Sequence, residues 1–543
     1  ARAVSVSSVN LDSNSATLLL SSRPWISRLD PTSGKHIMAP LSYAPLDHGC
    51  SFNSEVVKEG IVATAGKTLR ILSVDTGSME GGEDESFNIN KVGLRYTPRQ
   101  MTLLATGSEN RKVVLAVVEA DYNEYGFEEK KSMGFDFTGK GSKKGGDADG
   151  MDMDDSDDED NVKAAEEEEE NEDDEERTTP IRGPYPAAPG HWGSCIRLLD
   201  PANNCASLEC LELGRNEAAL CCASVQFHSR GGEPLLAVGT VTAMTMHPLK
   251  HTESHVALFR IVNGERLQLV HKTKVDDGPV LALAHFQGRL LVGIGKTLRL
   301  YEMGKRQLLR KSELRGLPSM VKTLQTAGDR VFVGDMLQSI QIIRYDTASN
   351  RLVLLAIDPS PRPITTQELL DWNTVAVGDK FGNITIMRLP RGAEAAAVDL
   401  TGQRALWESV SQTPRMDILC QYYLGDVVTS MTRASLVAGG AESLIYATVS
   451  GRVGALVPFT SRDDVDFFTQ LEGSLRVEAS RPTGRDPQAY RSYYAPVKHV
   501  VDGDLCGSFG ALSHKEQSKI AEKLDRTIAE VMKKLEDTRN ALL

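Results

Sequence analysis

Two copies of Gly-Lys-Thr, at residues 66–68 and 295–297, are the first pattern in this sequence that could do chemistry, because such tripeptides bind phosphate in nucleotide-binding loops. The phosphate-binding motif needs a further glycine five residues earlier, where Ile61 and Leu290 stand. The residues after each copy alternate as in a strand, whereas the motif is followed by a helix. We therefore predict a β-turn at both places.

Three histidines, His247, His251 and His255, form the second pattern, since imidazoles four residues apart share one face of a helix and could bind zinc. Pro248 and the strand-like flanking residues argue against a helix here. We predict a loop with solvated histidines.

Four cysteines form the third pattern and could also bind a metal: Cys205, Cys210, Cys221 and Cys222. Their spacings match no zinc template, and the eight cysteines of the chain include no CxxC pair. Without a secretion signal, this usage favours reduced, buried thiols over a disulfide framework. The sequence predicts no metal site.

The sequence contains no nucleophile elbow, no HExxH motif and no compact His/Asp/Ser group. We therefore expect no enzyme, no cofactor and no small-molecule substrate.

The 543 residues carry a formal charge of −13, and one acidic tract dominates it. Between Asp147 and Glu176 there are 19 acidic residues and one lysine, so the tract carries −18 and the rest of the chain +5. No charge-free apolar run reaches the roughly 18 residues of a membrane span, so no membrane partner is expected. The first residues show neither an initiator methionine nor a signal peptide, which predicts a piece of a longer chain.

A hairpin pattern recurs through the middle of the sequence. AGKTLRIL at 65–72 returns as IGKTLRLY at 294–301, and related paired strands follow in the next 160 residues. The glycines that end the first strand of successive hairpins are 54, 41 and 44 residues apart: Gly239, Gly293, Gly334 and Gly378. Four-stranded propeller blades repeat at about 40–50 residues, so the pattern predicts a mostly β fold built on a β-propeller.

The predicted organisation has three regions. Residues 1–90 are expected to be the tail of a preceding β-propeller, 91–460 a C-terminal β-propeller, and 461–543 a small C-terminal helical domain. Helix starts are predicted at Ser461 and at two capping boxes, Ser513 with Glu516 and Thr527 with Glu530. Residues from about 127 to 183, which include the acidic tract, are expected to be a disordered insertion.

Several segments resemble the splicing factor 3B subunit 3 family, which belongs with damage-specific DNA-binding protein 1 and the large subunit of cleavage and polyadenylation specificity factor. They are LRYTPRQ (94–100), VGDKFGNITIMRLP (377–390), LTGQRALWES (400–409), GGAESLIYATVSGRVGALVPFTS (439–461), RSYYAPVKHVVDGDLC (491–506) and the ending KLDRTIAEVMKKLEDTRNALL (523–543).

The resemblance implies that 91–460 is the third, seven-bladed propeller of a three-propeller scaffold, followed by the helical domain. It also implies a nuclear, non-catalytic scaffold of the SF3b complex of the U2 small nuclear ribonucleoprotein, which recognises the intron branch site. The implied partners are a HEAT-repeat large subunit, a small helical subunit and a zinc-finger subunit, with RNA contacted only through the complex.

Three segments that match the family, 362–372, 427–443 and the crossover into the helical domain, are expected to face partners, together with one cation at a hairpin end. The candidate contact residues are Lys311, Arg362, Thr365, Thr366, Trp372, Arg433, Glu442 and Lys498.

Two other functions stay open. The DNA-damage relative implies an adaptor of a cullin-type ubiquitin ligase in DNA repair, and the polyadenylation relative implies a scaffold of that machinery. A propeller enzyme would need ionisable residues gathered at the central channel, and no motif indicates them.

Overall fold

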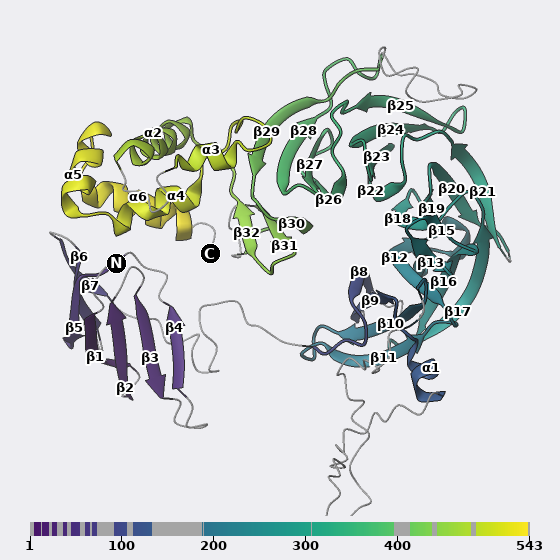
Figure 1. The fold of residues 1–543 in the computed structure, drawn as a ribbon, viewed down its shortest axis with the longest axis horizontal. Helices are drawn as coiled ribbons and strands as arrows, with labels where there is room; N and C mark the ends of the chain where they lie inside the picture. Colours follow the sequence, from purple (N-terminus) through teal and green to yellow (C-terminus); the bar gives the residue numbers. More distant parts are fainter. Residues whose placement is uncertain are drawn as a thin grey trace, which may run out of the picture. The chain divides into compact units, whose positions relative to one another are not determined.

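The computed structural model describes residues 5–11, 14–20, 24–29, 36–40, 45–54, 60–65, 68–72, 92–105, 112–132, 187, 189–305, 307–395, 413–436, 442–478 and 485–540. The chain forms two compact units, one of residues 91–321 and one of residues 1–90 with 322–543. Figure 1 shows their strands and helices coloured along the sequence.

The unit of residues 91–321 contains three four-stranded antiparallel sheets. The first has the order β11-β10-β9-β8, with β8 Pro98–Ala105, β9 Val113–Tyr122, β10 Trp192–Asp200 and β11 Ala206–Glu212. The second has the order β12-β13-β16-β17, with β12 Glu217–Gln226, β13 Pro234–Thr242, β16 Glu253–Val262 and β17 Arg266–Val275; the short pair β14 Thr245–Met246 and β15 Leu249–Lys250 lies between its strands in the sequence. The third is β18 Val280–Phe286, β19 Arg289–Ile294, β20 Thr297–Met303 and β21 Leu308–Leu314.

The other unit continues the same pattern with three more sheets. They are β22 Val321–Ala327, β23 Arg330–Asp335, β24 Ile340–Asp346 and β25 Arg351–Ile357; then β26 Ile364–Leu369, β27 Thr374–Asp379, β28 Asn383–Arg388 and β29 Asp417–Tyr423; then β30 Val428–Ala434, β31 Ser443–Thr448 and β32 Val453–Leu456. Successive strands pair with their neighbours, which is how a propeller blade is built. The described residues thus form six such sheets, and the number of seven blades stays a prediction.

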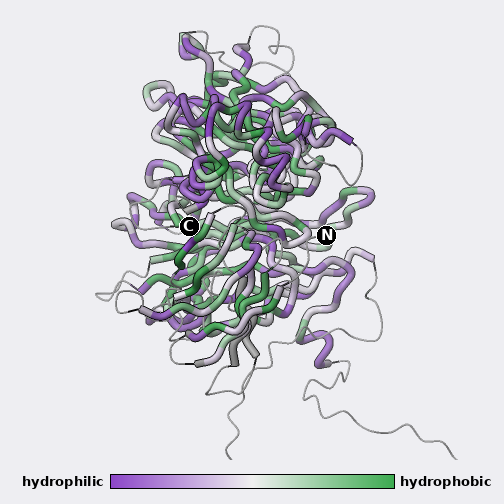
Figure 2. Tube along the Cα trace, turned by 90° about the vertical axis from the view of Figure 1, so that its left-hand side faces the viewer, coloured by the Kyte–Doolittle hydropathy of each residue, from purple (hydrophilic) through white to green (hydrophobic). Residues whose placement is uncertain are grey.

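Residues 5–72 supply two further sheets to this unit. One is β1 Ser5–Leu11, β2 Asn14–Leu20, β3 Trp25–Leu29 and β4 His36–Pro40, and the other is β5 His48–Phe52, β6 Gly60–Ala65 and β7 Thr68–Leu72. Figure 2 shows hydrophobic and hydrophilic residues interspersed along the chain trace. The predicted mostly β fold with a helical C-terminal region is confirmed.

The repeated glycines mark the places where consecutive sheets touch. Gly239, Gly293, Gly334 and Gly378 lie in β13, β19, β23 and β27, the second strand of each sheet. A Cβ at Gly239 would lie 2.6 Å from Val280 Cγ1, and one at Gly378 would lie 2.9 Å from Val428 Cβ. Both valines are the first residue of the next sheet of the same unit, so these glycines lie where one sheet closely approaches its successor.

The second Gly-Lys-Thr copy forms the turn between β19 and β20, with Gly295 at a φ of +52°. The predicted β-turn is confirmed there. In the first copy, residues 66 and 67 lie outside the described residues.

Helices follow the last sheet. They are α2 Arg462–Glu478, α3 Pro487–Arg491, α4 Gly503–Gly507, the 3-10 turn η3 Ser508–Ala511, α5 His514–Lys523 and α6 Ile528–Asn540. Their core joins Phe468, Leu471 and Leu475 of α2 with Ile520 of α5 and Val531 of α6. Phe467 is also buried, and its ring packs edge-on against Phe468, whereas Val465 is 40% exposed.

Both predicted capping boxes are present. The amide of Glu516 donates to Ser513 Oγ at 3.4 Å and the amide of Ser513 donates to Glu516 Oε2 at 3.0 Å. The corresponding distances for Thr527 and Glu530 are 3.3 and 2.7 Å. The hydrogen bonds from the cap hold the pKa values of both glutamates below their ordinary value.

Replacing Ser513 by alanine is expected to lower the local opening free energy of α5 by about 1 kcal/mol, because a first-turn amide loses its acceptor. Hydrogen exchange of the α5 amides measures this change. Ser518→Ala, inside the same helix, serves as the control, and equal effects of the two substitutions would contradict a capping role.

The short helix α1 Phe127–Ser132 occupies the first residues of the expected insertion. The amide of Gly126, just before the helix, donates to Glu129 Oε2 at 3.2 Å, so a local polar contact orders the start of the helix. Residues 133–186 lie outside the described residues. Within the described part of the chain, no helix has the length and hydrophobicity to cross a membrane.

Candidate partner-binding surface

Arg362 and Thr365, two candidate contact residues, use their polar atoms inside the unit. Arg362 Nε donates to Asp358 Oδ2 at 2.9 Å, and Asp358 is 6% exposed. Thr365 Oγ1 lies 2.6 Å from the carbonyl oxygen of Val428 and 3.1 Å from that of Gly378. Thr366 is half-buried beside Gly378, where its Cγ2 would lie 3.1 Å from an added Cβ. The two hydrogen bonds of Thr365 hold β26 against β27 and β30.

Trp372 lies in the turn between β26 and β27 and is 49% exposed. The guanidinium carbon of Arg330 lies 5.3 Å from the centre of the indole ring, and Arg330 Nη1 donates to the Trp372 carbonyl at 3.1 Å. Gly328, at a φ of +59°, packs so close that a Cβ there would lie 1.8 Å from the ring. Trp372 is therefore both accessible and fixed, as an anchor residue must be.

Arg433 and Glu442 pair with each other at the start and end of the β30–β31 connection. Their Nε and Oε2 atoms are 3.2 Å apart, and both side chains are exposed. Arg433 also donates to the carbonyl of Leu370, two residues before Trp372. The structure thus brings Trp372, Arg433 and Glu442 to one edge of the sheets β26–β29 and β30–β32, which we call the blade edge.

Lys498 ties the crossover segment to the edge strand β29. Its backbone exchanges hydrogen bonds with Gln421, with N to O distances of 3.0 and 3.1 Å, and its Nζ donates to the Ile418 carbonyl at 2.5 Å. These bonds give Lys498 a structural role, and its contact with a partner stays a prediction.

Lys311 belongs to β21 in the unit of residues 91–321. Its Nζ is 2.8 Å from Glu302 Oε2, and this ion pair holds the pKa of Glu302 below its ordinary value. The two side chains face each other across neighbouring strands, so the pair stabilises the hairpin.

A group of aromatic rings, which sequence reasoning missed, lies where α3 meets β29. The centre of the Tyr423 ring is 5.3 Å from that of Tyr490, 5.6 Å from Tyr493 and 5.8 Å from Tyr494; Phe381 stacks on Tyr494 at 5.1 Å. These five residues form what we call the tyrosine cluster. Tyr493 is 72% exposed and Tyr490 51%. The only signal in the sequence is the RSYYAPV segment, which carries the resemblance but not the contact with Tyr423.

Arg491 links the tyrosine cluster to the start of α4: its guanidinium carbon lies 5.5 Å from the centre of the Tyr490 ring. Its Nε donates to Asp502 Oδ2 at 2.8 Å, and both side chains are largely buried. Asp502 Oδ1 in turn accepts the amides of Asp504 and Leu505 at the start of α4. Exposed tyrosines held in place by buried polar contacts are typical of protein contact surfaces, where aromatic anchors supply most of the binding energy.

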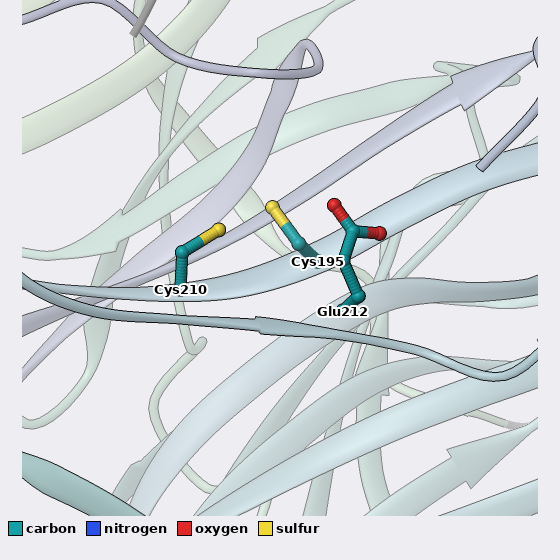
Figure 3. Close-up of side chains that lie close together, drawn as sticks. All are labelled: Cys195, Cys210 and Glu212. Carbon is teal, nitrogen blue, oxygen red and sulfur yellow. The ribbon is translucent and has the colours of Figure 1, made fainter. Parts of the chain in front are cut away.

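A second cluster lies in the unit of residues 91–321 and is made of thiols. Sγ of Cys195, Sγ of Cys210 and a carboxylate oxygen of Glu212 all lie within 4.8 Å of one another, and Figure 3 shows the three side chains lying side by side, with Cys195 between the other two. Cys195 is fully buried, and Cys210 and Glu212 are partly buried. We call these residues the thiol cluster.

The pKa values in the thiol cluster are shifted by the hydrogen bond between its two thiols, by burial and by two guanidinium groups. The hydrogen bond with Cys195 and the charges of Arg197 and Arg95 hold the pKa of Cys210 below its ordinary value. The same hydrogen bond and burial raise the pKa of Cys195. Burial raises the pKa of Glu212 to about 7, although Arg95 opposes the shift.

The structure does not bring together the four cysteines that the sequence offered as metal ligands: Cys205, Cys210, Cys221 and Cys222. Cys205 lies in the turn after β10, and Cys221 and Cys222 are adjacent in β12, where neighbouring side chains point to opposite faces. Cys210 instead meets Cys195, a pairing that depends on strand register and that linear spacing does not show.

Comparison with known proteins finds two family models. Residues 193–511 match the CPSF A subunit region, and residues 1–74 match the RSE1/DDB1/CPSF1 second beta-propeller.

Curated relatives are similar along 99% of this chain. The chain is 41% identical to spliceosome-associated protein 130 A of Arabidopsis thaliana, 38% to splicing factor 3B subunit 3 of Danio rerio and 35% to pre-mRNA-splicing factor rse1 of Emericella nidulans. It covers 43%, 42% and 41% of these proteins, so it spans about two fifths of their length. The resemblance found in the sequence is confirmed.

Proposed function

The chain belongs to the family that carries the CPSF A subunit region, and from this premise we propose that it is part of a non-catalytic scaffold in pre-mRNA splicing. Its similarity along 99% of its residues to proteins named as splicing factors supports this function over the cullin-adaptor and polyadenylation alternatives. The scaffold acts in the nucleus, within the SF3b complex of the U2 small nuclear ribonucleoprotein.

The observation that carries a scaffold role is the tyrosine cluster. Four tyrosines and a phenylalanine lie together at an accessible surface. Tyr493 is 72% exposed, so most of its ring is available to contact a partner. Rigid aromatic side chains lose little conformational entropy on binding, which is why they are enriched in protein interfaces.

The proposed partners are the HEAT-repeat large subunit, the small helical subunit and the zinc-finger subunit of the complex. Contact with RNA passes through these subunits. The blade edge of Trp372, Arg433 and Glu442 is the second proposed contact, since it combines a fixed, exposed indole with an exposed ion pair.

Replacing Tyr493 by alanine is expected to weaken co-purification of the splicing subunits about 30-fold, the equivalent of the roughly 2 kcal/mol typical of an interface anchor. The measurement is affinity purification of the tagged full chain from nuclear extract, with mass spectrometry and quantification of U2 RNA. Tyr493→Phe keeps the ring and should bind nearly as wild type.

Val477→Ala, which shortens a 75% exposed side chain of α2, is the control for loss of any surface group. Unchanged recovery with Tyr493→Ala would contradict the assignment of the surface. Recovery of a cullin or of polyadenylation factors in place of splicing subunits would contradict the splicing function itself.

A further inference from the structure

The thiol cluster has the donor set of a metal site, and strand register explains why its members converge. On β10 and β11, Cys195 is directly opposite Glu212 and Arg197 is directly opposite Cys210. Residues two apart on a strand share one face, so the two thiols and the carboxylate stand on the same side of the sheet. Their donor atoms lie within 4.8 Å of one another (Figure 3).

A disulfide does not fit this geometry. Cys195 and Cys210 are a diagonal pair, because the residues directly opposite them are Glu212 and Arg197. Diagonal neighbours in a sheet are about 7–8 Å apart, whereas the Cα atoms of a disulfide are usually about 4.4–6.8 Å apart. An atom held between the two sulfurs suits the spacing better than a bond between them.

We propose that Cys195, Cys210 and Glu212 bind one Zn²⁺ ion. Thiolate donors select zinc or monovalent copper among biological metals, and the carboxylate oxygen favours zinc, which accepts sulfur and oxygen together. Three protein ligands leave one of the four positions of zinc for water.

The charge of the surrounding residues suits a divalent ion. Arg197 pairs with Glu119, with Nε to Oε1 at 2.7 Å, and Arg95 pairs with Glu212, with Nη1 to Oε1 at 3.2 Å. With both thiols protonated, these two positive and two negative groups sum to zero. When one Zn²⁺ replaces the two thiol protons, the net charge of the ion and these side chains is still zero, so metal binding buries no unbalanced charge. A monovalent ion would leave the buried cluster at −1.

Outer contacts hold the carboxylate in place. Tyr96 Oη lies 3.3 Å from both carboxylate oxygens of Glu212, and the hydroxyl also accepts the amide of Phe127 at 2.8 Å. Hydrogen-bonded partners of this kind orient metal ligands and strengthen binding. Among the described residues, Arg197 Nη2 has no hydrogen-bond partner although its side chain is 1% exposed. Since Arg197 is opposite Cys210, a metal-bound thiolate there gives this N–H an acceptor.

The test titrates the reduced, metal-free full chain with Zn²⁺ against a chromophoric chelator, and with Co²⁺ to detect thiolate-to-cobalt charge-transfer absorption. We expect one ion per chain with that absorption band. Cys210→Ser, at a half-buried position, should abolish the band and weaken zinc binding at least about tenfold. Loss of a hydrogen-bonded partner of a metal ligand already lowers metal affinity about 10–100-fold, and Cys210 is itself a ligand.

Cys205→Ser, in the turn that joins the same two strands, is the matched control and should bind as wild type. Hydrogen exchange of β10 and β11 checks that each variant is folded. Absence of the absorption band in the wild-type chain, or equal zinc affinity of Cys210→Ser and wild type, would overturn the proposal. Neither result bears on the splicing function, which is tested at the tyrosine cluster.

Discussion

Replacing Arg197 by alanine is expected to destabilise the unit of residues 91–321 by about 3–5 kcal/mol, the cost of breaking a buried ion pair by removing one partner. The side chains of Arg197 and Glu119 are 1% and 0% exposed. Glu119 also accepts the amides of Arg95 and Tyr96 at 2.9 and 3.1 Å. Without the guanidinium, a buried carboxylate keeps only these backbone donors.

The effect is measured by denaturant-dependent hydrogen exchange of β9 and β10 in the metal-free chain, which reports on this unit alone. Arg215→Ala is the control: its Nε is also 2.7 Å from a glutamate oxygen, on Glu129, but the side chain is 78% exposed. Exposed pairs contribute about 0–1 kcal/mol. Similar losses for the two variants would show that burial does not determine the strength of these pairs.

Replacing Gly378 by alanine is expected to destabilise the other unit by about 1–3 kcal/mol through overpacking. The new Cβ would lie 2.9 Å from Val428 Cβ and 3.1 Å from Thr366 Cγ2. Because Val428 Cβ is fixed to the backbone of β30, the two sheets must move apart to relieve the contact. Hydrogen exchange of β27 and β30 should reveal the loss.

Gly473→Ala in α2 is the matched control, because it makes the same chemical change where a Cβ meets nothing within 4 Å. This substitution is expected to stabilise the helix by up to about 1 kcal/mol, since alanine is the better helix former. A Gly378→Ala variant as stable as wild type would mean that the glycine period does not reflect sheet packing.

Sequence reasoning succeeded where the signal is local. The capping boxes at Ser513 and Thr527 need only a residue and its third neighbour, and both are present in the structure. The period of Gly239, Gly293, Gly334 and Gly378 also predicted the repeated sheets. The period could not show why glycine is needed at these positions. The reason is the close approach of the first residue of the following sheet, which lies about 30–50 residues later in the chain.

Sites that depend on register or on distant segments were not predictable. Cys195 and Cys210 meet only because β10 and β11 pair with Cys195 opposite Glu212. Tyr423 joins Tyr490 across 67 residues of sequence, through the packing of α3 on β29. Arg362, Thr365 and Lys498 form hydrogen bonds within their own unit, which polarity in a sequence does not show; their contact with partners stays a prediction.

The attachment of Lys498 to β29 has a consequence for self-association. β29 is the last strand of its sheet, and such a strand offers unpaired amides and carbonyls to any other extended chain. The crossover occupies part of that row at Gln421, so a peptide cannot extend the sheet there while the segment is docked. If the crossover segment detached, the backbone groups of β29 that it covers would become unpaired. We expect edge-to-edge aggregation of any variant in which the crossover is released from β29.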